Sequence, residues 1–467
     1  MDERETGGGL PVGADLRGWL RRLADTGRLT TPRAGLDLRF EVAATANVLD
    51  GTAATFFRGP GGSDTPVVSG LLSHRDWMAE SMGVPTAEAA RTFGEASEHP
   101  IEWVEVPDPA CQQVITREVD LTTQLPIPTH NEHDSGAYIT AGLLIARNPV
   151  TGQQNVSIHR LQVTAPDKLG VLLLPRHTLA FLDESAAAGQ ALEIAVVIGV
   201  DPLTLMASQA IVPLGVDELT VSGALRGEPL PVTRCVTNEV RVPADAEIVL
   251  EGRIEAAERA PEGPFGEFPQ YYGERAERHV VTLDAMTTKE KPIFHTIVGG
   301  GLEHLLLGAL PREATFLVEL QRRFACVRDV HLSRGGTCRY HLYVQVSGHK
   351  PGEVTNVILS ALSVHYDVKH VVVVDADVDV HDPMEVEWAV ATRFQASRDL
   401  LVVDTAQGSK LDPSTVDGVG SKLGMDATSP LDAPEMKFLR IRVPGQEILT
   451  VDGIRAASDT TSPVDYF

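Results

Sequence analysis

The sequence predicts a mixed α/β protein built from several domains. Its 467 residues exceed what one hydrophobic core usually organises, so more than one domain is expected. Helical and strand patterns alternate toward both ends of the chain, which is typical of α/β domains. Between them, short β-branched runs recur with Gly and Pro at their ends, and this pattern favours a barrel or a sandwich. The composition, 43% hydrophobic and 22% charged, is that of a folded globular chain.

Residues 1–110 predict an N-terminal α/β domain. Residues 14–23 place apolar side chains at helical spacing, with Asp15 near the start where an acidic residue favours a helix. Residues 66–70, PVVSG, fit a buried strand. Further helices are predicted over residues 40–48, 77–82 and 86–96, and residues 1–13 are expected to form a flexible lead.

Residues 111–305 predict a second, strand-rich domain. Residues 192–199, LEIAVVIG, are a clear example of a short β-branched run that ends at a glycine. Residues 177–188 predict a helix inserted among the strands. The other strands are predicted at residues 138–147, 155–163, 247–252 and 279–286.

Residues 306–440 predict a C-terminal α/β domain. Residues 370–375, HVVVVD, form a largely apolar run, typical of a strand in a sheet that is covered on both sides. The tail at 441–467 contains one short predicted strand, residues 447–451, and we expect it to order only against a partner or another subunit. The remaining predictions here are helices over residues 314–324 and 353–365 and a strand over 341–346.

The charge and the cysteines limit the class of protein. A net charge of −24 argues against nucleic acid as a main partner, because phosphate binding requires a basic surface. No apolar run is long enough to span a membrane, and the acidic start lacks the features of a signal peptide. The cysteines form no CxxC pair and no zinc spacing, so free thiols in a reducing cytoplasm are expected. They are Cys111, Cys235, Cys326 and Cys338.

The stretch PEGPFGEFPQYYG, residues 261–273, carries two carboxylates with a Gly-Pro pair between them. A straight strand would place Glu262 and Glu267 on opposite faces, and Gly-Pro disfavours a helix, so a tight loop or a bent strand is expected. Such a turn can aim both carboxylates into one site, where their pKa values are pushed apart for acid/base chemistry. The alternative is a surface turn with solvated acids.

The stretch NVSIHR, residues 155–160, is the second candidate. Alternation places Asn155, Ser157 and His159 on one face and Arg160 on the other, unless the strand ends or bulges near Arg160. Arginine is suited to bind a substrate carboxylate through two parallel hydrogen bonds. The alternative is a barrel strand with a polar outer face.

His177 and Glu218 are further polar candidates. Together with Asn155 they would suit Mg²⁺ or Mn²⁺, although their separation in the sequence makes this pattern weak by itself. The sequence has no GxGxxG motif that opens a helix after a strand, and no GxxxxGK[ST] motif. The acidic run at residues 375–382 lacks the glycine and glutamate of an EF-hand loop, which favours solvated acids at a strand end.

Taken together, these stretches resemble the UbiD-type decarboxylases, which use prenylated FMN. The resemblance covers residues 15–440, and EGPFGE followed by a tyrosine pair is its most specific motif. It implies an N-terminal α/β domain, a central split β-barrel of the flavin-reductase type that holds the cofactor, and a C-terminal α/β oligomerisation domain. Further matching motifs, in chain order, are PIPTHNEHDSGAYITAG (126–142), VVIGVDP (196–202), ELTVSGALRGEPL (218–230), VPADAEIVLEG (242–252), KHVVVVDADVDVHDP (369–383), WAVATR (388–393) and SKLGMDAT (421–428).

The resemblance also implies site residues. Asn155, His177 and Glu218 would hold Mn²⁺ or Mg²⁺ against the cofactor phosphate, and a potassium ion is often found beside it. Arg160 would orient the substrate carboxylate, Glu262 would hold Arg160, and Glu267 would protonate the carbon that loses CO₂. Arg176 can line the substrate pocket, and His304 is another candidate specificity residue, suited to a polar or second acidic group on the substrate. The implied cofactor-binding residues are Asn155, Ser157, Ile158, Arg160, Arg176, His177, Ser208, Glu218 and Arg393.

The expected function is reversible non-oxidative decarboxylation of an α,β-unsaturated or (hetero)aromatic acid, with secondary metabolism as one setting that the Ala- and Arg-rich composition suggests. The main alternative is a non-catalytic flavin or metal–phosphate binding protein on the same fold, and the presence of Arg160, Glu262 and Glu267 favours the enzyme. A metal hydrolase is a third alternative, but it would need a cluster that activates a nucleophile near the ion. Expected partners are the acid substrate, a flavin prenyltransferase as cofactor supplier, and a second copy in a homodimer, with a hexamer as the alternative. Neither nucleic acid nor a membrane is expected as a partner.

Overall fold

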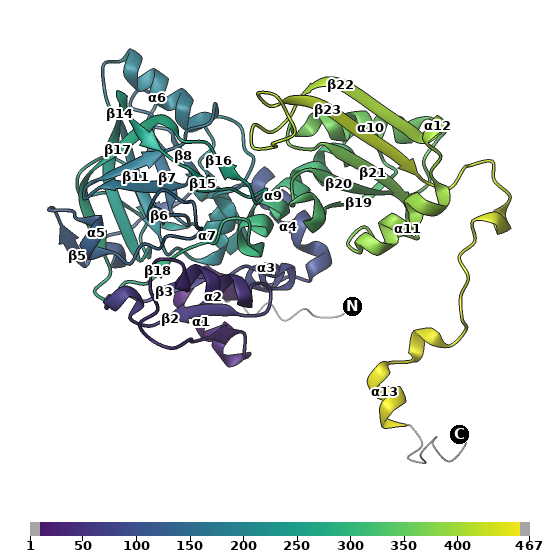
Figure 1. Cartoon of the computed structure of the whole chain (residues 1–467), viewed down its shortest axis with the longest axis horizontal. Helices are drawn as coiled ribbons and strands as arrows, with labels where there is room; N and C mark the ends of the chain where they lie inside the picture. The colour runs from purple at the N-terminus through teal and green to yellow at the C-terminus, as the bar shows by residue number, and fades with distance from the viewer. Residues whose placement is uncertain (1–9, 458–467) are drawn as a thin grey trace. The chain divides into compact units, whose positions relative to one another are not determined.

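The computed structural model describes residues 10–457, so the first nine residues of the predicted flexible lead lie outside the description. The chain divides into a large compact unit that ends at Ala427 and a second unit that begins at Thr428. The large unit contains several sheets and mixed helices, which confirms the prediction of a mixed α/β protein (Figure 1). The finer division at residues 110, 305 and 440 stays a prediction.

The N-terminal region packs short helices against a four-stranded sheet with the order β1–β2–β3–β18. β18 (Phe294–His295) comes from much later in the chain and pairs in parallel with β3 (Val67–Ser69). The predicted helices and the predicted strand are confirmed. The other elements are β1 (Leu29–Thr30), β2 (Ala54–Phe57), α1 (Leu16–Asp25), α2 (Glu41–Leu49), α3 (Arg75–Met82) and α4 (Ala89–Glu98).

The central region is built on a nine-stranded sheet. Its hydrogen-bonding path runs β6–β9–β10–β17–β14–β11–β7–β8, with β5 added on β17. In the described residues the first and last strands of this path do not pair with each other, so the sheet is open. The strands are β5 (Val114–Thr116), β6 (Tyr138–Ile139), β7 (Leu143–Arg147), β8 (Gln154–Ile158), β9 (Leu161–Ala165), β10 (Lys168–Val171), β11 (Leu192–Ile198), β14 (Ile248–Glu262) and β17 (Ala276–Thr288).

Two of the predicted strands are broken in the structure. Residues 138–147 form β6 and β7 with a gap between them, and residues 155–163 form β8 and β9 with a turn at His159 and Arg160. The turn is the strand end that the sequence required for Arg160 to join the site. The helices and small strands that flank the sheet are α5 (Leu121–Gln124), α6 (His177–Ala187), α7 (Pro202–Ala207), α8 (Glu218–Arg226), β4 (Val104–Glu105), β12 (Pro231–Arg234), β13 (Arg241–Pro243), β15 (Phe265–Gly266) and β16 (Tyr272–Gly273).

The C-terminal sheet has the order β19–β20–β21–β23–β22. Along β21 (His370–Asp375), Val371 and Val373 belong to the main core, whereas Val372 and Val374 belong to a separate cluster on the other face. This confirms that the strand is covered on both sides. The other elements are α9 (Leu302–Gln321), β19 (Val327–Leu332), β20 (His341–Val346), α10 (Glu353–Val364), α11 (Pro383–Arg393), α12 (Ala396–Asp399), β22 (Leu400–Gln407) and β23 (Val419–Ala427).

The helix predicted over residues 314–324 is wrong at its start, because α9 begins twelve residues earlier, at Leu302. Pro311 suggested a break, yet it lies inside the helix. Between the central and C-terminal sheets, α9 carries the chain from one to the other (Figure 1), and its buried residues include Phe316 and Leu320 of the main core.

The second unit contains α13 (Val451–Ala456) and short 3-10 turns at Glu435–Lys437 and Gln446–Ile448. The strand predicted over residues 447–451 is therefore wrong. Alternating Ile448, Leu449 and Val451 suggested a strand, but no partner strand pairs with them in the described residues. These three apolar side chains are exposed.

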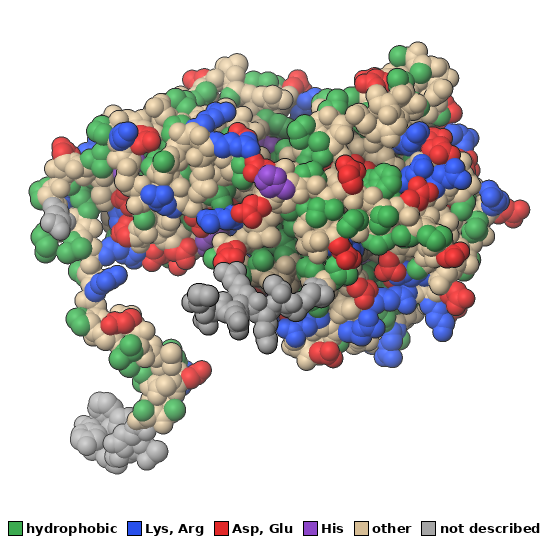
Figure 2. Space-filling model, turned by 180° about the vertical axis from the view of Figure 1, so that it is seen from behind, with side chains coloured by type: hydrophobic (Ala, Val, Ile, Leu, Met, Phe, Trp, Pro, Cys, Tyr) green, Lys and Arg blue, Asp and Glu red, His purple; other side chains and the backbone are tan. Residues whose placement is uncertain are grey.

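The surface mixes the two signs of charge. Figure 2 shows Lys and Arg side chains lying among Asp and Glu side chains on this face. None of the described helices is long and apolar enough to cross a membrane. All four cysteines are buried and unpaired, as predicted.

Candidate active site

The structure brings Arg160, Glu262 and Glu267 together. Arg160 lies in the turn between β8 and β9, Glu262 is the last residue of β14, and Glu267 follows β15. Arg160 Nη2 donates to Glu262 Oε2 at 2.8 Å, and Nη1 pairs with Glu267 Oε1. One guanidinium thus bridges two carboxylates that the sequence separates by a turn.

Glycines make this close approach possible. Gly263 has a φ of 87°, and a Cβ at this position would lie 2.8 Å from the carbonyl oxygen of Glu274. A Cβ at Gly273 would lie 2.7 Å from Arg160 Nη1. The chain therefore turns sharply after Glu262, and β16 leaves room for the guanidinium. This turn is why the alternation of a straight strand does not separate the two glutamates.

The three side chains are nearly excluded from water. The side chain of Arg160 is 7% exposed, that of Glu262 is 0% exposed and that of Glu267 is 11% exposed. Burial raises the pKa of Glu267, and the nearby Arg160 opposes this shift without cancelling it. A carboxyl group that keeps its proton toward neutral pH is suited to act as a general acid. The ring of Phe265 lies 5.6 Å from the Arg160 guanidinium and contributes to the dry surroundings.

Asn155, His177 and Glu218 also converge, although they lie far apart in the sequence. The Asn155 amide lies 3.1 Å from His177 Nδ1 and 3.3 Å from Glu218 Oε1. His177 is the first residue of α6, and Glu218 is the first residue of α8. Val156 N donates to Glu218 Oε2 at 2.6 Å, which holds the carboxylate against β8.

These donors fit a divalent cation. Glu218 is 4% exposed, and burial raises its pKa to about 8. A buried carboxylate beside an imidazole and an amide oxygen is a donor set that Mn²⁺ or Mg²⁺ accepts. Among the described residues no cluster of three His, Cys, Asp or Glu is arranged for a metal ion, so this site depends on the amide of Asn155 as its third donor.

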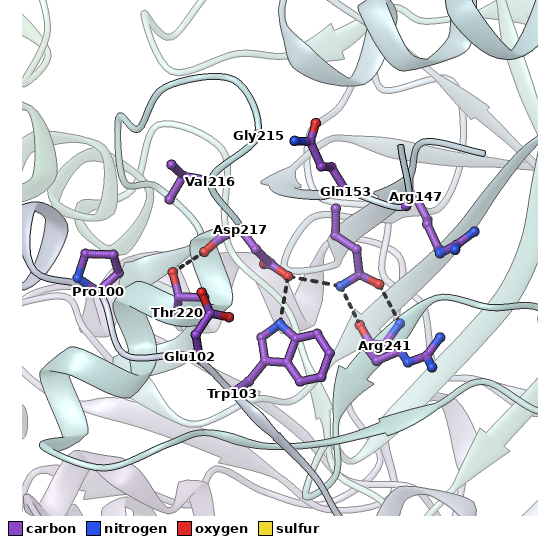
Figure 3. A pocket seen from close by; sticks show the side chains of 12 residues that line it. Pro100, Glu102, Trp103, Arg147, Gln153, Gly215, Val216, Asp217, Thr220 and Arg241 are labelled. Carbon is purple, nitrogen blue, oxygen red and sulfur yellow. Dashed lines mark hydrogen bonds between the residues drawn. The ribbon is translucent and has the colours of Figure 1, made fainter. Parts of the chain in front are cut away.

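A pocket of about 450 Å³ is lined by residues that include Gln154 and Asp217 (Figure 3). Asp217 Oδ2 accepts hydrogen bonds from Trp103 Nε1 and from Gln154 Nε2, both at 3.2 Å. Asp217 and Gln154 immediately precede Glu218 and Asn155 in the sequence. The floor of this pocket therefore fixes the neighbours of two candidate metal ligands, and the pocket itself is separate from Arg160.

The other predicted cofactor residues are placed unequally. Ser157 and Ile158 lie on β8 beside Asn155, and Ser157 Oγ hydrogen-bonds His159 Nε2 at 2.9 Å. Ser208 follows α7, and its hydroxyl donates to the carbonyl oxygen of Leu205 at 2.7 Å.

Two arginines of the prediction bind C-terminal residues. Arg393 on α11 is buried and pairs with Asp375 and Asp377, and no described contact joins it to the other candidates. Arg176, the residue before His177, donates to Tyr366 Oη at 2.6 Å and stacks over its ring.

The structure adds two arginines that sequence reasoning missed, the half-buried Arg312 and the buried Arg339. Arg339 Nη1 donates to the carbonyl oxygens of Leu305 and Cys338, and Arg312 Nη1 donates to that of Gly308. Within the described part of the chain neither arginine pairs with a carboxylate, and Arg312 Nε is buried without a partner. No local sequence signal marks them, because one lies within a helix and the other in a distant turn.

Arg339 lies next to the turn that carries Glu267 and Phe268. The ring of Phe268, the residue after Glu267, lies 5.2 Å from the guanidinium of Arg339 and packs edge-on against His304. Burial, followed by Arg339 and Arg312, lowers the pKa of His304 to about 3, and burial, with Arg339, lowers the pKa of Arg312. We call this group the cation cluster; it consists of Arg312, Arg339 and the neutral His304 beside them.

Three family models match the chain. They are the N-terminal, Rift-related and C-terminal domains of 3-octaprenyl-4-hydroxybenzoate carboxy-lyase, which match residues 20–97, 103–302 and 305–427. Among curated proteins, anhydromevalonate phosphate decarboxylase of Methanothermobacter thermautotrophicus is 40% identical, with 81% of this chain and 89% of that protein covered.

Solved structures agree. The UbiD-class enzyme HmfF from Pelotomaculum thermopropionicum, in complex with FMN, is 47% identical with a TM-score of 0.92, and 94% of this chain and 99% of that chain are covered. An evolved dimeric form of HmfF in complex with prFMN is 44% identical with a TM-score of 0.88 over the same shares of the two chains. The chain therefore belongs to the UbiD family, and it is a carboxy-lyase.

Proposed function

We propose that this carboxy-lyase removes CO₂ reversibly, without net oxidation, from an α,β-unsaturated or (hetero)aromatic carboxylic acid, with prenylated FMN as its cofactor. The observation that carries the proposal is the buried Arg160 between the carboxylates of Glu262 and Glu267. An arginine can orient a substrate carboxylate, and an adjacent acid can supply a proton. The FMN and prFMN complexes of the HmfF relative support the same cofactor here.

The central sheet is the proposed cofactor domain, a split β-barrel of the flavin-reductase type. Asn155, His177 and Glu218 would hold Mn²⁺ or Mg²⁺, and the ion would hold the cofactor phosphate, with K⁺ nearby. Ser157 and Ile158 share β8 with Asn155, which supports their contact with the cofactor. Ser208 and Arg393 stay weaker proposals. Prenylated FMN would supply the electron-accepting centre that the side chains lack.

The protein's own residues have distinct roles in the proposed reaction. Arg160 binds and orients the carboxylate that leaves as CO₂. Glu262, fully buried on the other side of the guanidinium, keeps Arg160 in place. Glu267 carries the proton to the carbon, because burial raises its pKa and leaves the carboxyl group protonated for longer as the pH rises. The dry surroundings limit protonation by water.

The cation cluster extends the proposal to the substrate. A buried guanidinium without a counter-ion is costly, so its natural complement is an anion from outside the chain. Arg339 lies beside Phe268, Arg312 and Arg339 both act on His304, and Arg176 is the residue before His177, the proposed metal ligand. We infer that the substrate carries a second anionic group, which the cation cluster binds while Arg160 holds the reacting carboxylate.

That second group could be a carboxylate or a phosphate, and both would suit guanidinium groups. The name of the Methanothermobacter relative includes a phosphate, whereas the cluster here contains a neutral His304 beside its two arginines. A ring with two carboxylates offers one charge to Arg160 and the other to the cation cluster. We favour the dicarboxylic acid.

The test is a reconstituted enzyme. The chain, co-expressed with a flavin prenyltransferase and supplied with Mn²⁺ and K⁺, is expected to retain prenylated FMN by native mass spectrometry and to release CO₂. A furan dicarboxylic acid should react at least about tenfold faster, by kcat/KM, than the matching monoacid, because it gains a charged hydrogen bond. Equal rates would contradict the dianionic substrate, and a flavin-loaded enzyme that releases no CO₂ from any acid would contradict the reaction itself.

A homodimer is the proposed assembly, with a hexamer as the alternative. Leu400, Val402 and Val419 on neighbouring strands β22 and β23 are at least 40% exposed, and an apolar sheet edge of this kind is suited to pairing. The dimeric form of the HmfF relative supports such an arrangement. A flavin prenyltransferase is proposed as cofactor supplier, and a cytoplasmic location follows from that supply.

A further inference from the structure

Glu262 is fixed by two donors that approach its two oxygens. Oε2 accepts from Arg160 Nη2 at 2.8 Å, and Oε1 accepts from the phenol of Tyr138 at 3.2 Å. The side chain is fully buried. A Cβ at Gly170 on β10 would lie 3.1 Å from Glu262 Cγ, so a glycine on the neighbouring strand makes room for it. Among the described residues, Tyr138 is the only donor to Oε1.

Tyr138 has one proton and several acceptors. Its hydroxyl lies 3.1 Å from Gln162 Oε1, 3.2 Å from Glu262 Oε1 and 3.4 Å from the carbonyl oxygen of Pro264. Gln162 Oε1 already accepts from Gly263 N at 3.0 Å. A carboxylate is a stronger acceptor than an amide or carbonyl oxygen, so we expect the Tyr138 hydroxyl to donate its hydrogen bond to Glu262. Burial raises the pKa of Tyr138 well above its usual range, so the phenol remains a donor.

Glu267 has a different environment. In the described structure its carboxylate accepts a hydrogen bond from Arg160. No second side chain of the described residues donates to it in the way that Tyr138 donates to Glu262. Asp134, which accepts from Gly266 N at 2.8 Å, is a further acid close to Glu267. The charged form of Glu262 is therefore held by two donors, whereas the charged form of Glu267 is held by one and opposed by other acids.

We propose that Tyr138 is a positioning residue, whose phenol holds the Glu262 carboxylate in place against Arg160, so that Glu267 is the carboxyl group that exchanges the proton. The inference rests on the proposed function, because it concerns the division of roles between the two glutamates. Tyr138 itself touches no reacting atom, since Glu262 lies between its hydroxyl and Arg160.

The first test needs neither cofactor nor substrate. Unfolding of the purified chain is measured for wild type, Tyr138→Phe, Glu262→Gln and the double variant. Tyr138→Phe keeps the ring against Phe265, so it leaves almost no cavity. We expect it to lower Tm in the wild type but much less in the Glu262→Gln background, because the charged acceptor is then absent. Equal effects in the two backgrounds would overturn the proposal.

The second test uses the reconstituted enzyme. Tyr138→Phe is expected to lower kcat about tenfold, the effect of one hydrogen bond to a charged group, with KM changed less than about twofold, since Arg160 still meets the carboxylate. Ser135→Ala is the control, because Ser135 Oγ contacts the Tyr138 hydroxyl at 3.1 Å but not Glu262. An unchanged kcat in Tyr138→Phe, or a loss of equal size in Ser135→Ala, would overturn the proposal.

The two tests separate the inference from the proposed function. If the wild type binds no flavin and releases no CO₂, the proposed function fails, yet the unfolding cycle still decides whether Tyr138 and Glu262 interact. If Glu262→Gln does not fold, the comparison of kcat in Tyr138→Phe and Ser135→Ala decides it instead.

Discussion

The structure contains two groups of arginine that are built in opposite ways: Arg160, beside Phe265, and the pair Arg312 and Arg339, of which Arg339 lies beside Phe268. Arg160 is bridged by Glu262 and Glu267, so its charge is neutralised within the chain. Within the described residues, Arg312 and Arg339 donate to carbonyl oxygens and form no ion pair, and the charge of Asp367 acts on both of them. The first group has its counter-charges within the chain, whereas the second is proposed to receive its counter-charge from a bound anion.

This difference in pairing indicates different roles for the two groups of arginine in the proposed reaction. Paired charges hold a geometry and can pass a proton, because one partner of the pair can be protonated. Unpaired buried cations hold a place for a charge that arrives from outside. In the proposed reaction, substrate specificity is thus separated from proton transfer, although Phe268 and Glu267 are neighbours in the sequence.

The largest expected effect concerns the paired group. Glu267→Gln keeps the shape of the side chain but removes its proton donor, so CO₂ release should fall by about 10²- to 10⁴-fold, the usual contribution of a general acid. Flavin retention, measured by native mass spectrometry, should not change, because Glu267 is not one of the proposed cofactor residues. Glu132→Gln, at an exposed acid upstream, is the control. Activity within tenfold of wild type would assign the proton to another group.

The second-largest effect concerns Arg312 in the unpaired group. Its replacement should lower the activity but raise the stability of the ligand-free chain. Arg312→Gln should lower kcat/KM for the dicarboxylic acid about 10- to 100-fold, because a charged hydrogen bond is lost. The same variant should raise Tm of the ligand-free chain, because it removes a buried charge without a counter-ion. Steady-state kinetics and thermal unfolding check the two signs.

Arg323→Gln is the matched control for this variant. Arg323 follows α9, and its Nη1 donates to Ser360 Oγ, outside the cation cluster. The control should leave the substrate preference unchanged. A fall in Tm for Arg312→Gln would show that the guanidinium stabilises the fold and that no ligand is needed to complete the cluster.

Sequence patterns predicted the group of Arg160 with its two glutamates. They did not predict the group of Arg312 and Arg339. The turn that unites Glu262 and Glu267 is marked by adjacent glycines and a proline, and NVSIHR is a continuous motif. Arg312 and Arg339 are separated by the end of α9 and by β19, and only tertiary packing brings them together. Buried charge depends on what covers a side chain, and a single sequence does not state this.

The predicted helices and strands show the same dependence on tertiary packing. Residues 370–375 were readable as a buried strand because every valine is covered, on one face or the other. The start of α9 was not readable, because Pro311 lies inside a helix whose packing outweighs the local penalty. In the tail, three apolar residues suggested a strand, yet a strand needs a partner, and none pairs with them among residues 10–457.

A smaller effect on substrate binding is expected from Asp367, whose charge acts on the two arginines of the cation cluster. This buried acid acts on Arg312 and Arg339 and competes with an incoming anion. Asp367→Asn should therefore lower KM for the dicarboxylic acid a few-fold, roughly the effect of one partly screened charge, and leave KM for the monoacid unchanged. An equal change for both acids would mean that Asp367 acts on the fold of the cluster and not on its charge.

The smallest effect is a pH dependence of stability at Glu267. Burial raises its pKa in the folded state, with Arg160 opposing, so the folded chain holds this proton more tightly than the unfolded chain does. The stability that this proton contributes is fully present below the usual range of a glutamate. It is lost as the pH rises through the raised pKa, by about 1.4 kcal/mol for each tenfold difference in proton affinity between the folded and unfolded chains.

Glu267→Gln has no such loss, so its Tm relative to wild type should increase from about pH 5 to about pH 8. Thermal unfolding of the cofactor-free chain across this range measures the difference, and Glu132→Gln should show none. A difference that decreases with pH would mean that Arg160 outweighs burial, and Glu267 would then be a second anchor like Glu262 instead of the proton donor.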